Sequence, residues 1–143
     1  MSHPTKPAVT QEVLQQWADS APFIKACQMT ITAVDAETGV VEMKMPLARN
    51  LTRDPEGRQF HGGPIASFID TAGDFAVAVA AGGGVPTINF RVDYLRPSGG
   101  EYLIARATAR RVGRTVGVAD VDVFDDQGRL TAIGRGCYSS QPG

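Results

Sequence analysis

The sequence predicts an α+β fold in which one antiparallel sheet curls around a single long helix. Two helix-like segments and six strand-like segments follow one another along the 143 residues, and strands do not alternate with helices. A doubly wound parallel sheet is therefore disfavoured, because it needs such alternation. The length is typical of one domain, so we expect a flexible tail over residues 1–9 and a single domain over residues 10–143.

The predicted domain begins with a short helix and a β-hairpin. Thr10 is of a residue type that caps helices, and Pro22 limits the helix that follows it. A further short turn covers residues 23–27. Alternating apolar residues then predict two strands, with a turn at residues 37–39 between them. The apolar residues of these two strands are Met29, Ile31, Ala33, Val41, Met43, Met45 and Leu47.

A long helix is predicted after a polar surface loop over residues 49–60. Pro64 suits the first position of this helix, where its missing N–H costs no hydrogen bond, and Gly82-Gly83-Gly84 ends it. One face of the helix is apolar, and many small residues let a sheet approach it closely. That apolar face consists of Ile65, Phe68, Ile69, Ala72, Ala76 and Val79.

The rest of the chain predicts four strands separated by turn-forming residues. They cover residues 88–95, 102–111, 115–124 and 130–138, and the first of them alternates throughout. A sheet with one buried face leaves open edges that commonly pair between subunits. We therefore expect a homo-oligomer.

Composition excludes several kinds of partner. The net charge of −1, from 14 basic and 15 acidic residues, gives no field that attracts nucleic acid or an anionic membrane. Two histidines and two cysteines cannot build a histidine-rich metal site or a Cys-x-x-Cys motif. We expect Cys27 and Cys137 to be free thiols in a reducing cytoplasm. No signal peptide is evident, and segment 64–81 is expected to be a core helix and not a membrane span, because it contains Asp70 and Asp74.

Candidate chemistry lies near the start of the long helix. Gly62 and Gly63 carry amide groups that the first helical turn leaves without partners, and such donors can hold a negative oxygen. One oxyanion donor is worth ~2.7–4 kcal/mol in comparable sites. Asp70 lies about two turns further along an otherwise apolar helix. Desolvation there would raise its pKa toward a value that suits a general base.

The motif His61-Gly62-Gly63, the aspartate Asp70 nine positions after the histidine, and the later segment Asn89–Pro97 resemble hotdog-fold acyl-CoA thioesterases of the phenylacetate-degradation (PaaI-like) type. The resemblance covers about residues 25–140. It implies a hotdog fold and hydrolysis of an acyl- or aryl-acyl-CoA thioester without metal or cofactor. It also implies that the Gly62 N–H polarises the carbonyl and that Gly63 permits the turn. Asp70 would activate water or attack the thioester directly, commonly across a subunit interface, so a homodimer or homotetramer is expected.

The resemblance offers roles for further residues, and each role has a structural alternative. Thr87 would hold the attacking water, or it is an ordinary strand residue. His61 would bond the carbonyl region of the substrate, or it braces the loop. A basic set would contact the CoA phosphates or form a solvated surface; it comprises Arg96, Arg111, Gly113, Arg114 and Thr115.

The chain departs from the family pattern at Pro55, and it carries a second aspartate, Asp74, on the long helix. Family members often carry asparagine or glutamine six residues before the histidine, where this chain has Pro55. Asn50 and Gln59 both remain open as replacements. Asp74 lies one helical turn beyond Asp70, and we expect it to be solvated or paired with an arginine.

The main alternative is a hotdog protein that binds acyl-CoA without cleaving it. Such a protein would keep the groove and the basic rim but would need no base, so Asp70 separates the two functions. An α/β-hydrolase is excluded by the length and by the missing Gly-x-Ser-x-Gly elbow. A hotdog dehydratase is also disfavoured. It would need a histidine paired with an acid in a hydratase motif, and His61 does not stand in such a motif. A purely structural oligomer explains neither Gly62 nor Asp70.

Overall fold

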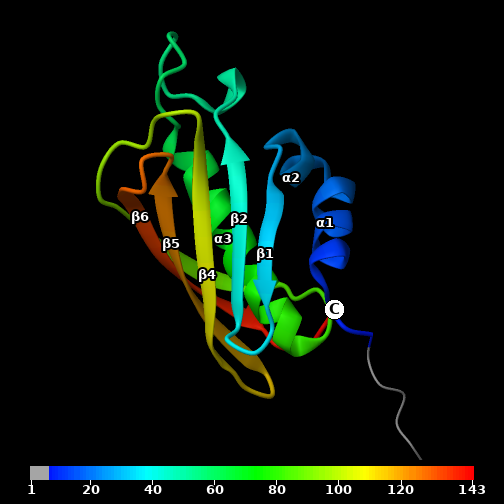
Figure 1. The fold of residues 1–143 in the computed structure, drawn as a ribbon. Coiled ribbons are helices and arrows are strands. Elements are labelled where there is room, and N and C mark those ends of the chain that lie inside the picture. The colour runs from blue at the N-terminus through cyan, green and yellow to red at the C-terminus, as the bar shows by residue number, and fades with distance from the viewer. Residues whose placement is uncertain (1–6) are drawn as a thin grey trace, which may run out of the picture.

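A computed structural model of the chain describes residues 7–143 (Figure 1). Residues 1–6 of the predicted tail lie outside the described residues. Val9, which the prediction assigns to the same tail, is buried in the core. The predicted α+β class is confirmed, because an antiparallel sheet curls around one long helix and a short N-terminal helix lies beside the sheet.

The sheet contains the six strands that the sequence predicts. Its order is β1-β2-β4-β5-β6-β3, and every neighbouring pair is antiparallel. Strands β1 and β3 are therefore the two edges of the sheet. The strands span Thr30–Asp35 (β1), Val40–Pro46 (β2), Thr87–Tyr94 (β3), Tyr102–Val112 (β4), Val116–Asp125 (β5) and Leu130–Ser139 (β6).

Helix α1 (Gln11–Ser20) covers the β1 edge, and the short helix α2 (Pro22–Ala26) follows it (Figure 1). The Thr10 hydroxyl caps α1, as predicted, by accepting a backbone hydrogen bond from its first turn at 3.2 Å. The Gln15 Oε1 accepts the N–H of Ile31 at 2.8 Å. This bond occupies a backbone group that an edge strand otherwise leaves open.

Strand β1 departs from the predicted alternation at Ala33. Ile31 pairs with Met43, but Ala33 pairs with Glu42, so the register shifts by one residue between them. The resulting β-bulge leaves Ala33 exposed, whereas Met29 and Ile31 are buried. The predicted apolar role of Ala33 is wrong because the extra residue rotates the strand after Ile31.

Helix α3 (Gly62–Ala81) lies in the hollow of the sheet. It begins two residues earlier than predicted, so Pro64 is its third residue, and the His61 ring caps it. Gly82 ends it in the left-handed conformation with φ of 83°. By length and composition α3 could cross a membrane, but it packs against the sheet as the core helix that the sequence predicts. Its buried residues include Ile65, Phe68, Ile69, Ala72 and Ala76.

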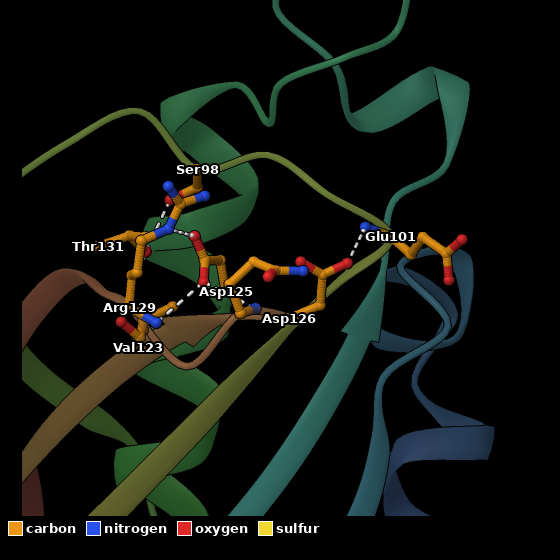
Figure 2. A network of polar contacts seen from close by, with 8 residues as sticks. Ser98, Glu101, Val123, Asp125, Asp126, Arg129 and Thr131 are labelled. Atoms are coloured by element: carbon orange, nitrogen blue, oxygen red, sulfur yellow. Dashed lines mark hydrogen bonds and ion pairs between the residues drawn. The ribbon is translucent and has the colours of Figure 1, made fainter.

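Polar contacts join the loop after β3 to the turn between β5 and β6 (Figure 2). The buried Ser98 hydroxyl donates to Thr131 Oγ1 at 2.8 Å, and the Asp126 carboxylate accepts a backbone N–H of the same loop at 2.9 Å. The buried Asp125 carboxylate accepts the N–H and the guanidinium of Arg129 at 2.9 and 2.8 Å. Burial alone would raise the Asp125 pKa, but the hydrogen bonds from Arg129 lower it below its ordinary value. The network fixes the loop that passes the start of α3.

Candidate active site

Asp70 and Thr87, both predicted site residues, are in direct contact. The Thr87 Oγ1 donates a hydrogen bond to Asp70 Oδ1 at 2.8 Å and so joins β3 to α3. Asp70 is half-buried. Burial raises the pKa of its carboxyl, and the Thr87 hydrogen bond offsets part of that rise. An oriented carboxylate of raised pKa is suited to take a proton from water.

A β-bulge explains why Thr87 reaches α3. Asn89 pairs with Cys137 and Thr87 pairs with Tyr138, so Ile88 is the extra residue. In a regular strand, Thr87 and Asn89 would lie on the same face of the sheet. The bulge turns Thr87 to the opposite face, which Tyr138 shares and which α3 covers. The predicted alternation therefore breaks at Ile88, and the break aims the Thr87 hydroxyl at Asp70.

Asp74 lies in a different environment from the one that the sequence predicts. It is half-buried, and within residues 7–143 no arginine and no hydrogen-bond donor contacts its carboxyl. Burial and, next, the charge of Asp70 raise the pKa of Asp74 to about 7. The expectation of a solvated or arginine-paired Asp74 is wrong, because no described arginine reaches the carboxyl and apolar residues line this side of α3. They line a cavity of about 430 Å³ that includes Trp17, Ile24, Phe75, Val85 and Pro86.

The start of α3 holds a second group of predicted residues. The Tyr94 hydroxyl donates to the Gly62 carbonyl at 2.6 Å, and a Cβ at position 62 would lie 3.2 Å from that hydroxyl. His61 Nδ1 accepts the Gly63 N–H at 3.2 Å, which is a bracing contact. The Gly62 N–H, the first amide of α3, has no acceptor in the described part of the chain. Neither glycine has a positive φ, so Gly63 is not needed for an unusual turn.

A cavity of about 370 Å³ opens beside Gly62. Arg96, a predicted phosphate contact, lines this cavity. Arg53 lines it too, although the sequence does not distinguish this arginine from others in the loop. Apolar walls and two guanidinium groups thus meet at the start of α3. The apolar part includes Phe60, Ile65, Leu95 and Pro97.

Gly62 and Asp70 of one chain are too far apart to act on the same carbonyl group. They are eight residues apart on α3, which corresponds to a rise of about 12 Å. A reacting carbonyl has to lie within about 3 Å of both the oxyanion donor and the attacking group. Within one chain, therefore, these two groups cannot both contact one carbonyl group.

The predicted basic hairpin is also remote from Gly62 in the same chain. It connects β4 to β5 at the end of the sheet opposite to the loop that carries Arg96 (Figure 1). That end also holds Thr87, because Val116 and Thr87 pair with the adjacent residues Ser139 and Tyr138 of β6. The hairpin residues are Arg111, Gly113, Arg114 and Thr115.

The loop before α3 contains a small hairpin. This hairpin explains why Pro55 stands where family members often carry asparagine or glutamine. The His61 N–H donates to the Leu51 carbonyl at 2.8 Å, so the segment between them projects outward with Pro55 exposed. Asn50 directly precedes this hairpin. It lines a cavity of about 350 Å³ together with Gly63.

Of the two replacements left open by the sequence, the fold brings Asn50 to the start of α3. Gln59 instead forms a backbone bridge to Gly99. The sequence Asp54-Pro55-Glu56-Gly57 carries the signature of a tight turn, with proline second and glycine fourth. The Gly57 N–H donates to the Asp54 carbonyl at 3.1 Å. This turn is the signal that could have revealed the hairpin and hence the position of Asn50.

Cys27 and Cys137 are free thiols, as predicted. Cys27 is buried, and burial raises the pKa of its thiol. Among residues 7–143, no three histidine, cysteine, aspartate or glutamate side chains come together in an arrangement that could hold a metal ion.

Sequence comparisons relate the chain to known thioesterases and esterases. The profile of the thioesterase superfamily matches residues 59–132. A Halobacterium salinarum protein whose name proposes an esterase is 39% identical over 119 residues, which cover 76% of this chain and 78% of the relative. The Escherichia coli acyl-coenzyme A thioesterase PaaI is 36% identical over 78 residues, which cover 53% of this chain and 54% of PaaI.

Solved structures of thioesterases are also similar to this chain. A thioesterase from Haemophilus influenzae superposes with a TM-score of 0.82 at 25% identity, covering 94% of this chain and 92% of the other. The Escherichia coli PaaI structure superposes with a TM-score of 0.77 at 26% identity, covering 90% and 89%.

The antiparallel sheet that curls around one long helix is a hotdog fold, and the chain belongs to the thioesterase superfamily. Within that superfamily it is of the PaaI-like type.

Proposed function

We propose that the protein hydrolyses an acyl- or aryl-acyl-CoA thioester to the free acid and CoA. The observation that carries this proposal is the Asp70 carboxyl, half-buried and oriented by Thr87 at 2.8 Å. A protein that only binds its ligand has no need of such a group. The name of the relative PaaI, an acyl-coenzyme A thioesterase, supports CoA esters as the substrate class.

In the proposed reaction Asp70 takes a proton from water, and the resulting hydroxide equivalent attacks the thioester carbonyl carbon. The carbon–sulfur bond then breaks, and the proton passes to the CoA thiolate. Direct attack by Asp70, followed by hydrolysis of the acyl–aspartyl anhydride, yields the same products. The Gly62 N–H, at the positive end of α3, would stabilise the carbonyl oxygen as it becomes negative. Thr87 would keep the Asp70 carboxylate aimed at the water.

The complete site is proposed to form between two copies of the chain. The separation of about 12 Å along α3 between Gly62 and Asp70 supports this arrangement, because it prevents one chain from supplying both groups. The exposed edge strand β3 supports it as well. It presents Ile88, Phe90 and Tyr94, whose exposed fractions are 55%, 40% and 53%, and large apolar side chains on an open edge favour pairing with another strand.

A two-fold axis beside β3 would complete two sites at once. Thr87, at the first end of β3, contacts Asp70, and Tyr94, at the other end, contacts Gly62. Antiparallel pairing of two β3 strands would set the Thr87 end of one chain against the Tyr94 end of the other. A homodimer, or a homotetramer built from such dimers, is the proposed assembly.

The same pairing would gather the predicted phosphate contacts. Arg96 and Arg53 lie beside Gly62, whereas the hairpin with Arg111 and Arg114 lies at the Thr87 end of the sheet. Two-fold pairing would bring the hairpin of one chain toward the arginines of the partner, and guanidinium groups suit phosphates. The hairpin residues Gly113 and Thr115 would contribute to the same contact. We propose no resident cofactor or metal and a cytoplasmic location, where free thiols persist.

Release of CoA thiol from a panel of straight-chain and aryl-acyl-CoA esters tests the proposal. Asp70→Asn should lower kcat by at least about a hundredfold, the range expected for loss of a general base, while Asp122→Asn, which changes an exposed carboxylate, should not. Light scattering has to show that both variants keep the wild-type mass. Full activity of an oligomeric Asp70→Asn protein would refute the mechanism, and hydrolysis of no ester by wild type would refute the substrate class.

A further inference from the structure

Tyr138 makes a contact with Asp70 that the proposed chemistry does not use. Its hydroxyl donates to the backbone carbonyl of Asp70 at 3.1 Å. The side chain is fully buried, with 0% exposed. In an α-helix the same carbonyl also accepts the N–H four residues on, so the tyrosine adds a second donor to a group that is already bonded. The contact is thus made at the residue that carries the proposed base.

Two glycines create the space for this tyrosine. A Cβ at Gly73 of α3 or at Gly136 of β6 would overlap the Tyr138 hydroxyl and ring. Neither glycine has a positive φ, so backbone conformation does not require them. Their common property is the room that they leave for the ring between α3 and the sheet.

Thr87 and Tyr138 hold Asp70 from two sides. They are cross-strand partners in the β3–β6 ladder, brought onto one face by the bulge at Ile88. Thr87 bonds the carboxylate of Asp70, and Tyr138 bonds its carbonyl. The side chain and the backbone of one residue are therefore fixed by two hydroxyl groups from the same rung of the sheet.

We infer that Tyr138 is a positioning residue for the reaction, because its hydroxyl fixes the backbone of Asp70 so that the carboxylate stays on Thr87. The inference rests on the proposed role of Asp70. Misplacement of a reacting group by about 1 Å can cost about a hundredfold in rate. Loss of one of two anchors should cost less, about tenfold in kcat. KM should be nearly unchanged, because a fully buried side chain offers no surface to a ligand.

The kinetic test compares Tyr138→Phe, Thr87→Val and the double variant. Each removes one hydroxyl and keeps most of the side-chain volume. Shared positioning predicts that the double variant loses less activity than the product of the two single losses, because either loss releases Asp70. Tyr102→Phe is the matched control, since Tyr102 lies on the sheet beside Lys44, remote from Asp70. Wild-type kcat in Tyr138→Phe, or losses that multiply fully, would overturn the inference.

A second measurement decides the question without turnover. The titration of the Asp70 carboxyl is followed by carbon-13 NMR in the wild type and in the same three variants. The Thr87 hydrogen bond lowers the pKa of Asp70, so a loosened Asp70 should titrate at higher pH in Tyr138→Phe. In the double variant, the Asp70 carboxyl should then titrate at the same pH as it does in Thr87→Val alone. An unchanged midpoint in a folded Tyr138→Phe protein would show that the tyrosine is merely structural.

The wild-type protein offers a check that needs no folded variant. A buried hydroxyl proton held by the Asp70 carbonyl should exchange slowly and give a proton resonance with a cross-peak to α3. Fast exchange of the Tyr138 hydroxyl would remove the anchor on which the inference depends. If wild type titrates as expected but hydrolyses no thioester, the proposed function fails while the positioning of Asp70 stands.

Discussion

Asp74 should make the protein less stable as pH rises, and Asp74→Asn should remove that effect. Its pKa is about 7 in the folded protein, against an ordinary value of 3.8. Below about pH 4 both the folded and the unfolded chain hold the proton. Between about pH 4 and pH 7 the unfolded chain loses it and the folded chain keeps it, so the free energy of unfolding falls. Above about pH 7 the full cost of the buried charge is present.

The size of the effect follows from the difference between the two pKa values. One pH unit corresponds to about 1.36 kcal/mol, and partial access of water to the carboxyl reduces the result. The ionised Asp74 should therefore cost the folded state on the order of 2–4 kcal/mol above pH 7. Asp74→Asn, which keeps the shape but carries no charge, should be more stable than wild type by that amount at pH 8.

Urea unfolding at a fixed protein concentration measures this difference. Wild type and Asp74→Asn are compared at intervals from pH 4.5 to pH 8, with Asp122→Asn as the exposed control. The difference between wild type and Asp74→Asn should widen with pH and level off near pH 7. A difference that stays constant, or widens toward acid, would refute the assignment of a half-buried carboxyl at Asp74 that no described arginine pairs.

Three further variants test other parts of the structure. Phe90→Glu places a charge on the exposed β3 edge and should split the oligomer and abolish activity, whereas Phe23→Glu on α2 should keep the wild-type mass by light scattering; an intact oligomer in Phe90→Glu would argue against pairing through β3. Gly73→Ala should overpack Tyr138 and cost about 1–3 kcal/mol in urea unfolding, while Gly84→Ala, with open space around it, should cost less than about 0.5 kcal/mol; equal costs would contradict the close packing. Asp125→Asn should cost about 1–3 kcal/mol at pH 7, and because its folded pKa is lowered, the deficit should shrink as pH falls below about 4; a deficit independent of pH would exclude a stabilising charge at Asp125.

The spacing of apolar residues predicted the fold correctly where the helices and strands are regular. The apolar face of α3 and the turn at residues 37–39 follow from spacing and residue type alone, and both are confirmed. Asp70 could be singled out because a carboxylate on an apolar helix is conspicuous in sequence. Its partner Thr87 could not be assigned a direction, because a one-residue bulge at Ile88 decides which face the hydroxyl takes.

Residues whose environment depends on distant segments were beyond reach of the sequence. Asp74 shares a cavity with residues of α1, which is far from it along the chain, and of the segment before β3. In the sequence Tyr138 is an ordinary strand residue, and only the structure shows that Gly73 and Gly136 leave room for its ring. Local patterns specify local structure, whereas these contacts arise only from tertiary packing.

Subunit complementation tests the central claim, that Asp70 of one chain acts with Gly62 of another. Gly62→Pro removes the proposed oxyanion donor at the first position of the helix, which tolerates proline. Its Cβ would lie 3.2 Å from the Tyr94 hydroxyl, so light scattering has to show that this variant keeps the wild-type mass. Each variant alone, Gly62→Pro or Asp70→Asn, should assemble but hydrolyse almost no thioester.

Equal amounts of the two variants are then unfolded and refolded together. Half of the resulting dimers should contain one chain of each kind, and each such dimer has one intact site, so thiol release should recover to about a quarter of the wild-type rate. Thiol release that stays at the level of the single variants, although mixed dimers form, would contradict an active site shared between subunits.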